Sequence, residues 1–304
     1  MYLNYKITNT NRGTTDLHMS TSTATGSRFT LGKHDMMVFI LVMSLTGLQN
    51  AVTEILPEFT LGPLELGVGG FVFIPIVLVL LFRTYWAALA VPVGEIVFGE
   101  ILLGEFDGLG AMEGLLLIPV CYYFAVKLLQ DPENTTQLAL VVFLAEALEE
   151  FFAMWIDIGK IYVGVEELEA VPGLPESILV LEGVDFVTQM AITGIVFGVL
   201  PALYLYPKLH GKVEPLLGME PFQGERGASM TDGLSIKALL AVLIAVPLAF
   251  VAEAASEVGG AINVVWEPEF LDVYGQLFIA VPIVIAAAVA AIVWYRASQP
   301  TRER

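Results

Sequence analysis

The residues of this chain best suited to binding or catalysis are acidic residues that lie inside apolar segments. Glu95 lies within the apolar run WAALAVPVGEIVFGEILLG, and Glu146, Glu149 and Glu150 lie within QLALVVFLAEALEEFFAMW. An ionisable side chain in hydrocarbon is costly, so it marks a ligand site, a pathway or a buried pair. The chain has 32 Asp and Glu but only 14 Lys and Arg. Buried acids are therefore expected to be protonated, bridged by water or neutralised by a cationic ligand.

The spacing of polar residues along the apolar segments extends this set. Residues three or four apart share one face of a helix, as Glu146 and Glu150 do. We predict that a small polar or cationic solute binds to seven side chains: Glu54, Glu95, Glu146, Glu149, Glu150, Asp185 and Gln189. The alternative is that these acids only adapt the protein to high salt, because excess carboxylates keep a surface hydrated.

Other chemistries lack the residues that they need. The three histidines lie outside the apolar segments: His18, His34 and His210. The single Cys121 cannot form an internal disulfide. We therefore predict no catalytic residue, no metal site and no cofactor. The pair Glu149 and Glu150 resembles that of intramembrane proteases of the abortive-infection type, but Met154 stands where those have arginine and the partner histidines are missing. The protein is thus predicted not to be an enzyme.

The composition predicts a membrane environment for these elements. Hydrophobic residues make up 56% of the 304 residues, charged residues make up 15%, and the mean hydropathy is +0.75. Apolar runs of about 20 residues, enough to cross a bilayer core, recur between turns rich in Pro, Gly and Asp. We predict an all-α polytopic membrane helix bundle with about eight transmembrane helices, over residues 36–56, 65–82, 84–103, 109–129, 135–157, 178–206, 235–257 and 271–295.

Loop charge orients the predicted bundle. Basic residues fall in alternate loops: Arg83, Lys127, Lys208, Lys212, Arg226, Arg296, Arg302 and Arg304. The other loops are acidic, and Lys160 is the only basic residue among them. Such loops are cytoplasmic by the positive-inside rule, so both termini are predicted to be inside and the protein to be a multi-pass protein of the cell membrane. This orientation places most of the intramembrane acids in the outer half, where they would line an outward-facing acidic vestibule.

The same pattern divides the chain into five segments. They are a flexible cytoplasmic tail (1–35), a six-helix membrane core (36–206), a cytoplasmic linker (207–234), a C-terminal helix pair (235–295) and a second cytoplasmic tail (296–304). The net charge of −18 and the pI near 4.4 argue against nucleic acid as a partner. No G-x-x-x-x-G-K-[ST] motif is present, so any use of ATP requires a partner.

Residues 39–206 resemble the membrane-embedded substrate-binding subunits of energy-coupling-factor transporters. The resemblance consists of the outer loop LPEFTLGPLELGVGG, the apolar run IPIVLVLLF, a tight inner turn, and WAALAVPVGEIVFGEILLG. It implies a core of six helices that binds a micronutrient near the outer face. It also implies that the small residues Gly47 and Ala51 contact a transmembrane coupling subunit driven by ATPases.

Two other functions remain open on the sequence. One is a structural or accessory subunit that scaffolds a larger membrane complex without transport of its own. The other is a secondary carrier coupled to protons or cations. The leading prediction is a subunit that takes up a small polar or cationic solute and is energised by a partner ATPase complex.

Overall fold

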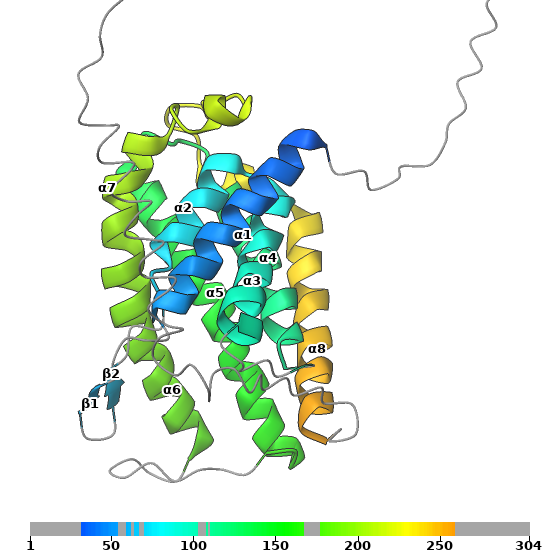
Figure 1. The fold of residues 1–304 in the computed structure, drawn as a ribbon. Coiled ribbons are helices and arrows are strands. Elements are labelled where there is room, and N and C mark those ends of the chain that lie inside the picture. Colours follow the sequence, from blue (N-terminus) through cyan, green and yellow to red (C-terminus); the bar gives the residue numbers. More distant parts are fainter. Residues whose placement is uncertain are drawn as a thin grey trace, which may run out of the picture. The chain divides into compact units, whose positions relative to one another are not determined.

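The computed structural model describes residues 32–53, 59–61, 64–66, 70–102, 108, 110–166 and 177–258. Its elements in chain order are α1 (Lys33–Thr53), β1 (Phe59–Leu61), β2 (Leu64–Leu66), α2 (Phe73–Phe82), α3 (Tyr85–Gly94), η1 (Glu95–Ile101), α4 (Met112–Lys127), α5 (Thr135–Val163), α6 (Ile178–Gln189), η2 (Met190–Val199), α7 (Leu200–Leu209), η3 (Glu214–Leu217), η4 (Met230–Gly233) and α8 (Ile236–Val258) (Figure 1). The described residues are thus almost entirely helical, which confirms the predicted all-α class. The span predicted over 271–295, the tail 296–304 and most of the tail 1–35 lie outside the described residues.

Within the described residues, three helices are long and apolar enough to cross a membrane. They are α1, the continuous helix Ile178–Leu209 that α6, η2 and α7 form together, and the part of α8 over Ile236–Ser256. About 20 residues span a bilayer core of about 30 Å. The 29 residues of α5 are also long enough, but three glutamates interrupt its apolar sequence. By length and composition, the structure therefore supports the prediction of a membrane protein.

One predicted span begins later than expected. The sequence predicts a span over 65–82, but α2 begins at Phe73. Residues Leu64–Leu66 instead form strand β2, which pairs antiparallel with β1. The physical reason is the segment GVGG that precedes α2, because glycine inside a helix costs about 1 kcal/mol relative to alanine.

The helices α1 and α3 cross at two glycines. A Cβ atom added to Gly47 would lie 2.6 Å from the carbonyl oxygen of Gly94. A Cβ atom added to Gly94 would collide with the carbonyl oxygen of Met43 and lie 3.0 Å from the amide nitrogen of Gly47. Small residues allow helix backbones to approach in this way. The close contact between α1 and α3 therefore requires glycine, which has no Cβ atom, at both positions.

The turn between α2 and α3 is built around Arg83. Its φ of 50° lies in the left-handed region, which is uncommon for a residue with a Cβ atom. The Arg83 N–H donates to the Val79 carbonyl at 2.7 Å and so ends α2, while the Thr84 hydroxyl accepts from the Ala87 N–H at 3.1 Å and caps α3. The guanidinium lies 3.8 Å from the ring centroid of Phe222. Burial lowers the pKa of Arg83.

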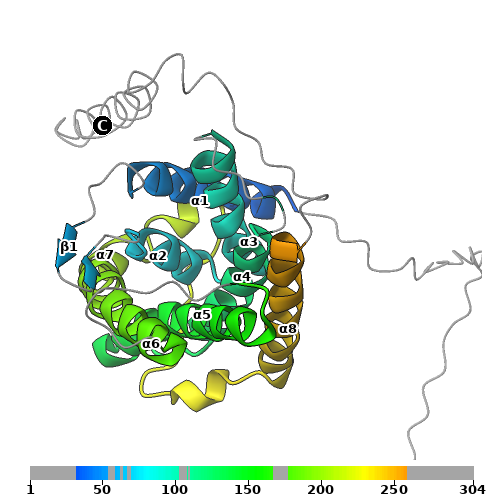
Figure 2. The same cartoon turned by 90° about the horizontal axis from the view of Figure 1, so that it is seen from below.

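The segment predicted as a linker, 207–234, folds against the turn between α4 and α5. The Gly227 N–H donates to Asp131 Oδ2 at 2.9 Å, and Gln137 Nε2 donates to the Ala228 carbonyl at 2.6 Å. The next helix, α8, packs against α4 and α5 at the edge of the bundle (Figure 2). The segment is therefore attached to the bundle, and α8 is part of the same helical body as α4 and α5.

Apolar packing fills the half of the bundle nearest Arg83. The buried apolar residues come mainly from four stretches: Ile76–Phe82 of α2, Ala87–Val91 of α3, Ile118–Leu129 of and after α4, and Leu138–Ala145 of α5. Each stretch is the part of its helix that adjoins the turns at Arg83 or Asp131. The acidic residues lie beyond these stretches, with Glu95 and Glu100 in η1 after α3, and Glu146, Glu149, Glu150 and Asp157 after Ala145 in α5.

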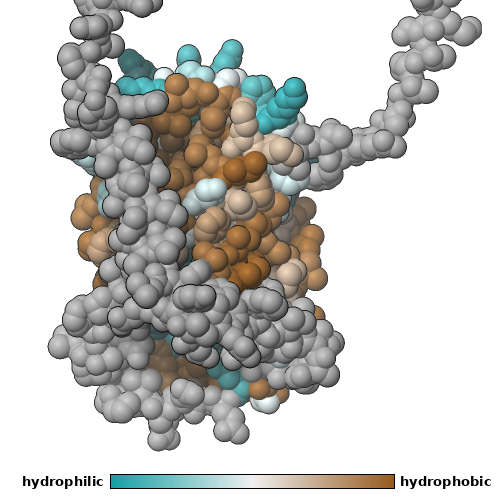
Figure 3. Space-filling model, in the orientation of Figure 1, coloured by the Kyte–Doolittle hydropathy of each residue, from teal (hydrophilic) through white to brown (hydrophobic). Residues whose placement is uncertain are grey.

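Many side chains on the outside of the helix bundle are also apolar. Leu200, Ile244 and Val251 are 58%, 59% and 62% exposed, on α7 and α8. Figure 3 shows hydrophobic side chains over the middle of the visible face and hydrophilic ones at its upper end. An exposed apolar surface of this extent is expected where helices face lipid.

Candidate functional site

A cavity of about 450 Å³ lies among α3, η1, α4, α5 and α8. Half of its twelve described lining residues are acidic: Glu95, Glu100, Glu113, Glu149, Asp157 and Glu253. The others are small or apolar, such as Pro92, Gly110 and Ala153, and no Lys or Arg is among the described lining residues. The cavity thus combines several acidic side chains with space for a small ligand.

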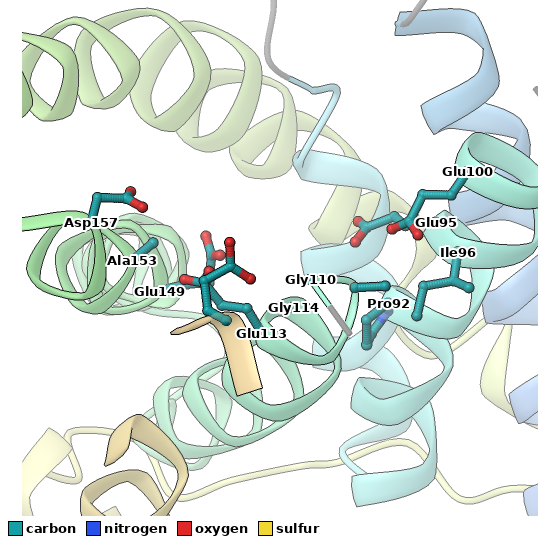
Figure 4. Close-up of a pocket in the computed structure, with 12 residues that line it drawn as sticks. Pro92, Glu95, Ile96, Glu100, Gly110, Glu113, Gly114, Glu149, Ala153 and Asp157 are labelled. Atoms are coloured by element: carbon teal, nitrogen blue, oxygen red, sulfur yellow. The ribbon is translucent and has the colours of Figure 1, made fainter. Parts of the chain in front are cut away.

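The π-helical geometry of η1 places two of these carboxylates on one wall. Glu95 and Glu100 are five residues apart, and in an α-helix they would point about 140° apart. In a π-helix, hydrogen bonds link residues five apart, so Glu95 and Glu100 lie about one turn apart on the same face. Figure 4 shows both on one side of the cavity, with Glu113, Glu149 and Asp157 on the other. Such helical segments are rare and occur frequently at functional sites.

Two further glutamates of α5 adjoin the cavity residue Glu149. One carboxylate oxygen from each of Glu146, Glu149 and Glu150 lies within 4.8 Å of the others. Glu146 is 3% exposed and accepts a hydrogen bond from the Tyr122 hydroxyl at 2.7 Å. Carboxylate oxygens are the ligands that Ca²⁺ and Mg²⁺ prefer in proteins. Of the described residues, these three are therefore the group that could share a metal ion.

Replacing Tyr122 with phenylalanine is expected to destabilise the protein. The variant removes the hydroxyl that donates to the buried Glu146 carboxyl group, and losing a partner for a buried polar group costs about 1–3 kcal/mol. The measurement is chemical unfolding of the full chain in detergent, followed by circular dichroism. Tyr123→Phe is the matched control, because its ring contact with Tyr85, at 5.8 Å between centroids, does not need the hydroxyl. Equal stability of the two variants would contradict the prediction.

Lys160 lies at one edge of the cavity. Its Nζ is 2.8 Å from Asp157, 3.1 Å from Glu166 and 3.2 Å from Glu253. Its side chain is 8% exposed, whereas that of Glu166 is 43% exposed. Asp157 and Glu253 also line the cavity, on α5 and α8. One ammonium group therefore neutralises part of the charge on two different walls.

The structure brings together some of the predicted binding residues and separates others. Four of the seven lie in or beside the cavity: Glu95, Glu146, Glu149 and Glu150. Asp185 is exposed on α6, and Gln189 accepts a hydrogen bond from Thr193 at 3.0 Å. Neither is among the described residues that line the cavity. Glu54 lies outside the described residues.

The two residues of the predicted partner contact, Gly47 and Ala51, lie within the packing of α1. Gly47 faces Gly94 and the ring of Phe98, and Ala51 is 5% exposed. Both positions are thus covered by the chain itself. Gly47 therefore allows a close contact within the bundle.

Sequence reasoning missed members of the cavity on other helices. Glu100, Asp157 and Glu253 were visible as acids within apolar runs, but nothing in the sequence showed that they converge with Glu95. Glu113 had a weaker signal, since it lies near the start of the span predicted over 109–129 and in the first turn of α4. Its place beside the others becomes clear only once α4 is packed against α3 and α8.

Fold and site together describe a helical protein in which three of the described helices are long and apolar enough to span a membrane, and in which an acidic cavity lies among α3, η1, α4, α5 and α8. The chain belongs to a family of unknown function, DUF8171, whose model matches residues 37–304. No curated protein and no solved structure matches it.

Proposed function

We propose that this protein binds a small cationic solute in the acidic cavity and takes it up across the cell membrane. The observation that supports this proposal is the presence of six acidic side chains around one cavity, with no Lys or Arg among its described lining residues. Lys160 pairs with Asp157 and Glu253, but one ammonium group cannot balance six acidic side chains. A neutral solute would leave the cavity with an excess of acidic groups, and an excess of buried negative charge is unfavourable. A cation would supply the compensating charge.

The proposal includes a topology of about eight membrane spans with both termini inside. Support comes from two basic residues, Arg83 and Lys127, which meet at one end of the bundle, whereas Lys160 lies at the acidic end. The Lys127 ammonium donates to the Arg83 carbonyl at 3.3 Å, and Arg83 stacks on Phe222. The acidic cavity comes from the opposite halves of α3, α4 and α5. With the basic end in the cytoplasm, the cavity would open outward.

The test is direct measurement of cation binding to the full chain in detergent. Isothermal titration with K⁺, Mg²⁺, Mn²⁺ and spermidine is expected to show saturable binding of at least one of them to the wild-type protein. Glu149→Gln removes a cavity charge and is expected to weaken that binding about tenfold or more. Glu225→Gln, an exposed acid outside the cavity, is the matched control and should bind like the wild type.

Absence of saturable binding to the wild type would contradict the proposed function. It would favour the second class of function, an accessory subunit of a membrane complex. Equal weakening by Glu149→Gln and Glu225→Gln would assign the binding to general surface charge instead of the cavity.

Energy for uptake is proposed to come from a partner ATPase complex. The chain has no P-loop motif of its own, and its resemblance to substrate-binding subunits suggests such a partner. Because Gly47 is used inside the bundle, a coupling subunit would contact another surface. Copurification of the tagged protein from its native membrane, followed by mass spectrometry, is expected to recover ATPase subunits. Recovery of the protein without them would leave a secondary carrier as the mechanism.

A further inference from the structure

The edge of the acidic cavity already holds a cation that belongs to the chain. Lys160 Nζ lies within 3.2 Å of carboxylate oxygens from Asp157 and Glu253, and both of these residues line the cavity. A third carboxylate, Glu166, lies 3.1 Å from the same nitrogen. Glu166 is more exposed than Glu253 and is not among the described lining residues. The ammonium group therefore has two partners on the cavity wall and one outside it.

We propose that Lys160 is a tethered counter-ion that competes with the solute cation and so sets the affinity and charge selectivity of the cavity; this inference rests on the proposed cation-binding function. In the empty cavity, the ammonium neutralises Asp157 and Glu253. When a solute cation enters, these two carboxylates turn to the solute, and Glu166 retains the ammonium at the edge. A solute must therefore attract the two carboxylates more strongly than Lys160 does.

Apolar packing makes this role separable from a purely structural one. The helices that Lys160 bridges, α5 and α8, are also joined by a buried cluster of Leu117, Ile156, Ala245 and Ala249. Phe250 of α8 additionally packs against Gly159, next to Lys160. The contact between α5 and α8 does not depend on the ion pairs alone. A substitution of Lys160 is therefore expected to leave α8 in place.

Competition predicts that removing the ammonium strengthens cation binding. Titration of the full chain in detergent with K⁺, Mg²⁺, Mn²⁺ and spermidine is expected to give dissociation constants about tenfold lower for Lys160→Gln than for the wild type. Lys160→Arg keeps the charge and is expected to stay within about threefold of the wild type. A folded Lys160→Gln variant with unchanged or weaker binding would overturn the proposal.

A second measurement uses the wild-type protein and does not depend on the variant's stability. Acetylation of lysines by an N-hydroxysuccinimide ester, read by mass spectrometry, reports how accessible each ammonium is. Saturating cation is expected to speed the labelling of Lys160 several-fold, because its cavity partners are taken by the solute. Lys212, which is exposed and distant in sequence, is the internal control and should not change. Labelling of Lys160 that is unaffected by bound cation would overturn the proposal.

The two proposals fail in different ways. No saturable binding to the wild type would overturn both the cation-binding function and the role of Lys160. Suppose instead that binding is saturable, that Glu149→Gln weakens it and that Lys160→Gln leaves it unchanged. The cation-binding function would then stand, and only the role of Lys160 as a counter-ion would be overturned.

Discussion

Replacing Gly94 with alanine is expected to lower the free energy of unfolding by about 3 kcal/mol, near the upper end of the usual cost of overpacking. The added Cβ atom would collide with the carbonyl oxygen of Met43 in α1. Because that atom belongs to the backbone, no side-chain rotation relieves the contact, and α1 and α3 must separate. The measurement is chemical unfolding of the full chain in detergent, followed by circular dichroism and size-exclusion chromatography.

Gly183→Ala provides the matched control for this substitution. Gly183 also lies within a helix, α6, but apart from its chain neighbours and the backbone of its own helix no atom lies within 4 Å of the position that its Cβ would take. Alanine there is expected to be neutral or to stabilise the protein by up to about 1 kcal/mol, since it favours the helix. Equal stability of the Gly94→Ala and Gly183→Ala variants would show that the crossing of α1 and α3 is looser than the structure indicates.

The second large effect is expected from removing charge on both walls of the cavity. Glu95 and Glu149 lie on opposite sides of it (Figure 4). At an effective dielectric constant of about 20, a carboxylate about 8 Å from a cation contributes roughly 2 kcal/mol. Glu95→Gln and Glu149→Gln should therefore each weaken cation binding about 30-fold, and the double variant should weaken it by about the product of the two.

A double-mutant cycle tests whether the two carboxylates act on one bound cation. Dissociation constants are measured for the wild type, both single variants and the double variant. Glu220→Gln, which changes an exposed acid outside the cavity, controls for net charge. Independent, additive losses are expected when both groups attract the same ion without touching each other. If the double variant binds as well as the more weakly binding of the two single variants, the cation lies at only one wall.

The sequence predicted several helices closely because local signals define their ends. The span predicted from residue 135 begins there, because the Asn134 side chain accepts hydrogen bonds from the Thr136 and Gln137 N–H groups. The span predicted from residue 178 begins at Ile178. Apolar run length, proline and glycine are all properties of neighbouring residues, so these boundaries could be predicted before any packing was known.

The candidate site was only partly predictable for the opposite reason. Glu95 and Glu149 were found because a charged residue within an apolar run is visible in the sequence. Their convergence with Glu113 and Glu253 depends on how α4 and α8 pack, and that contact joins residues more than 100 positions apart. The close contact at Gly47 was likewise visible as a small residue, but its partner was not.

The helical pitch of η1 has a consequence for how relatives of this protein are compared. In this chain, four residues separate Glu95 from Glu100, and the π-helical turn brings the two carboxylates onto one face. A relative with one residue fewer between them would be able to form ordinary α-helix, in which residues four apart point only about 40° apart. It would present the same pair of carboxylates. An alignment gap at this point therefore marks a change of pitch that preserves the site, whereas a substitution of either glutamate marks a change of its charge.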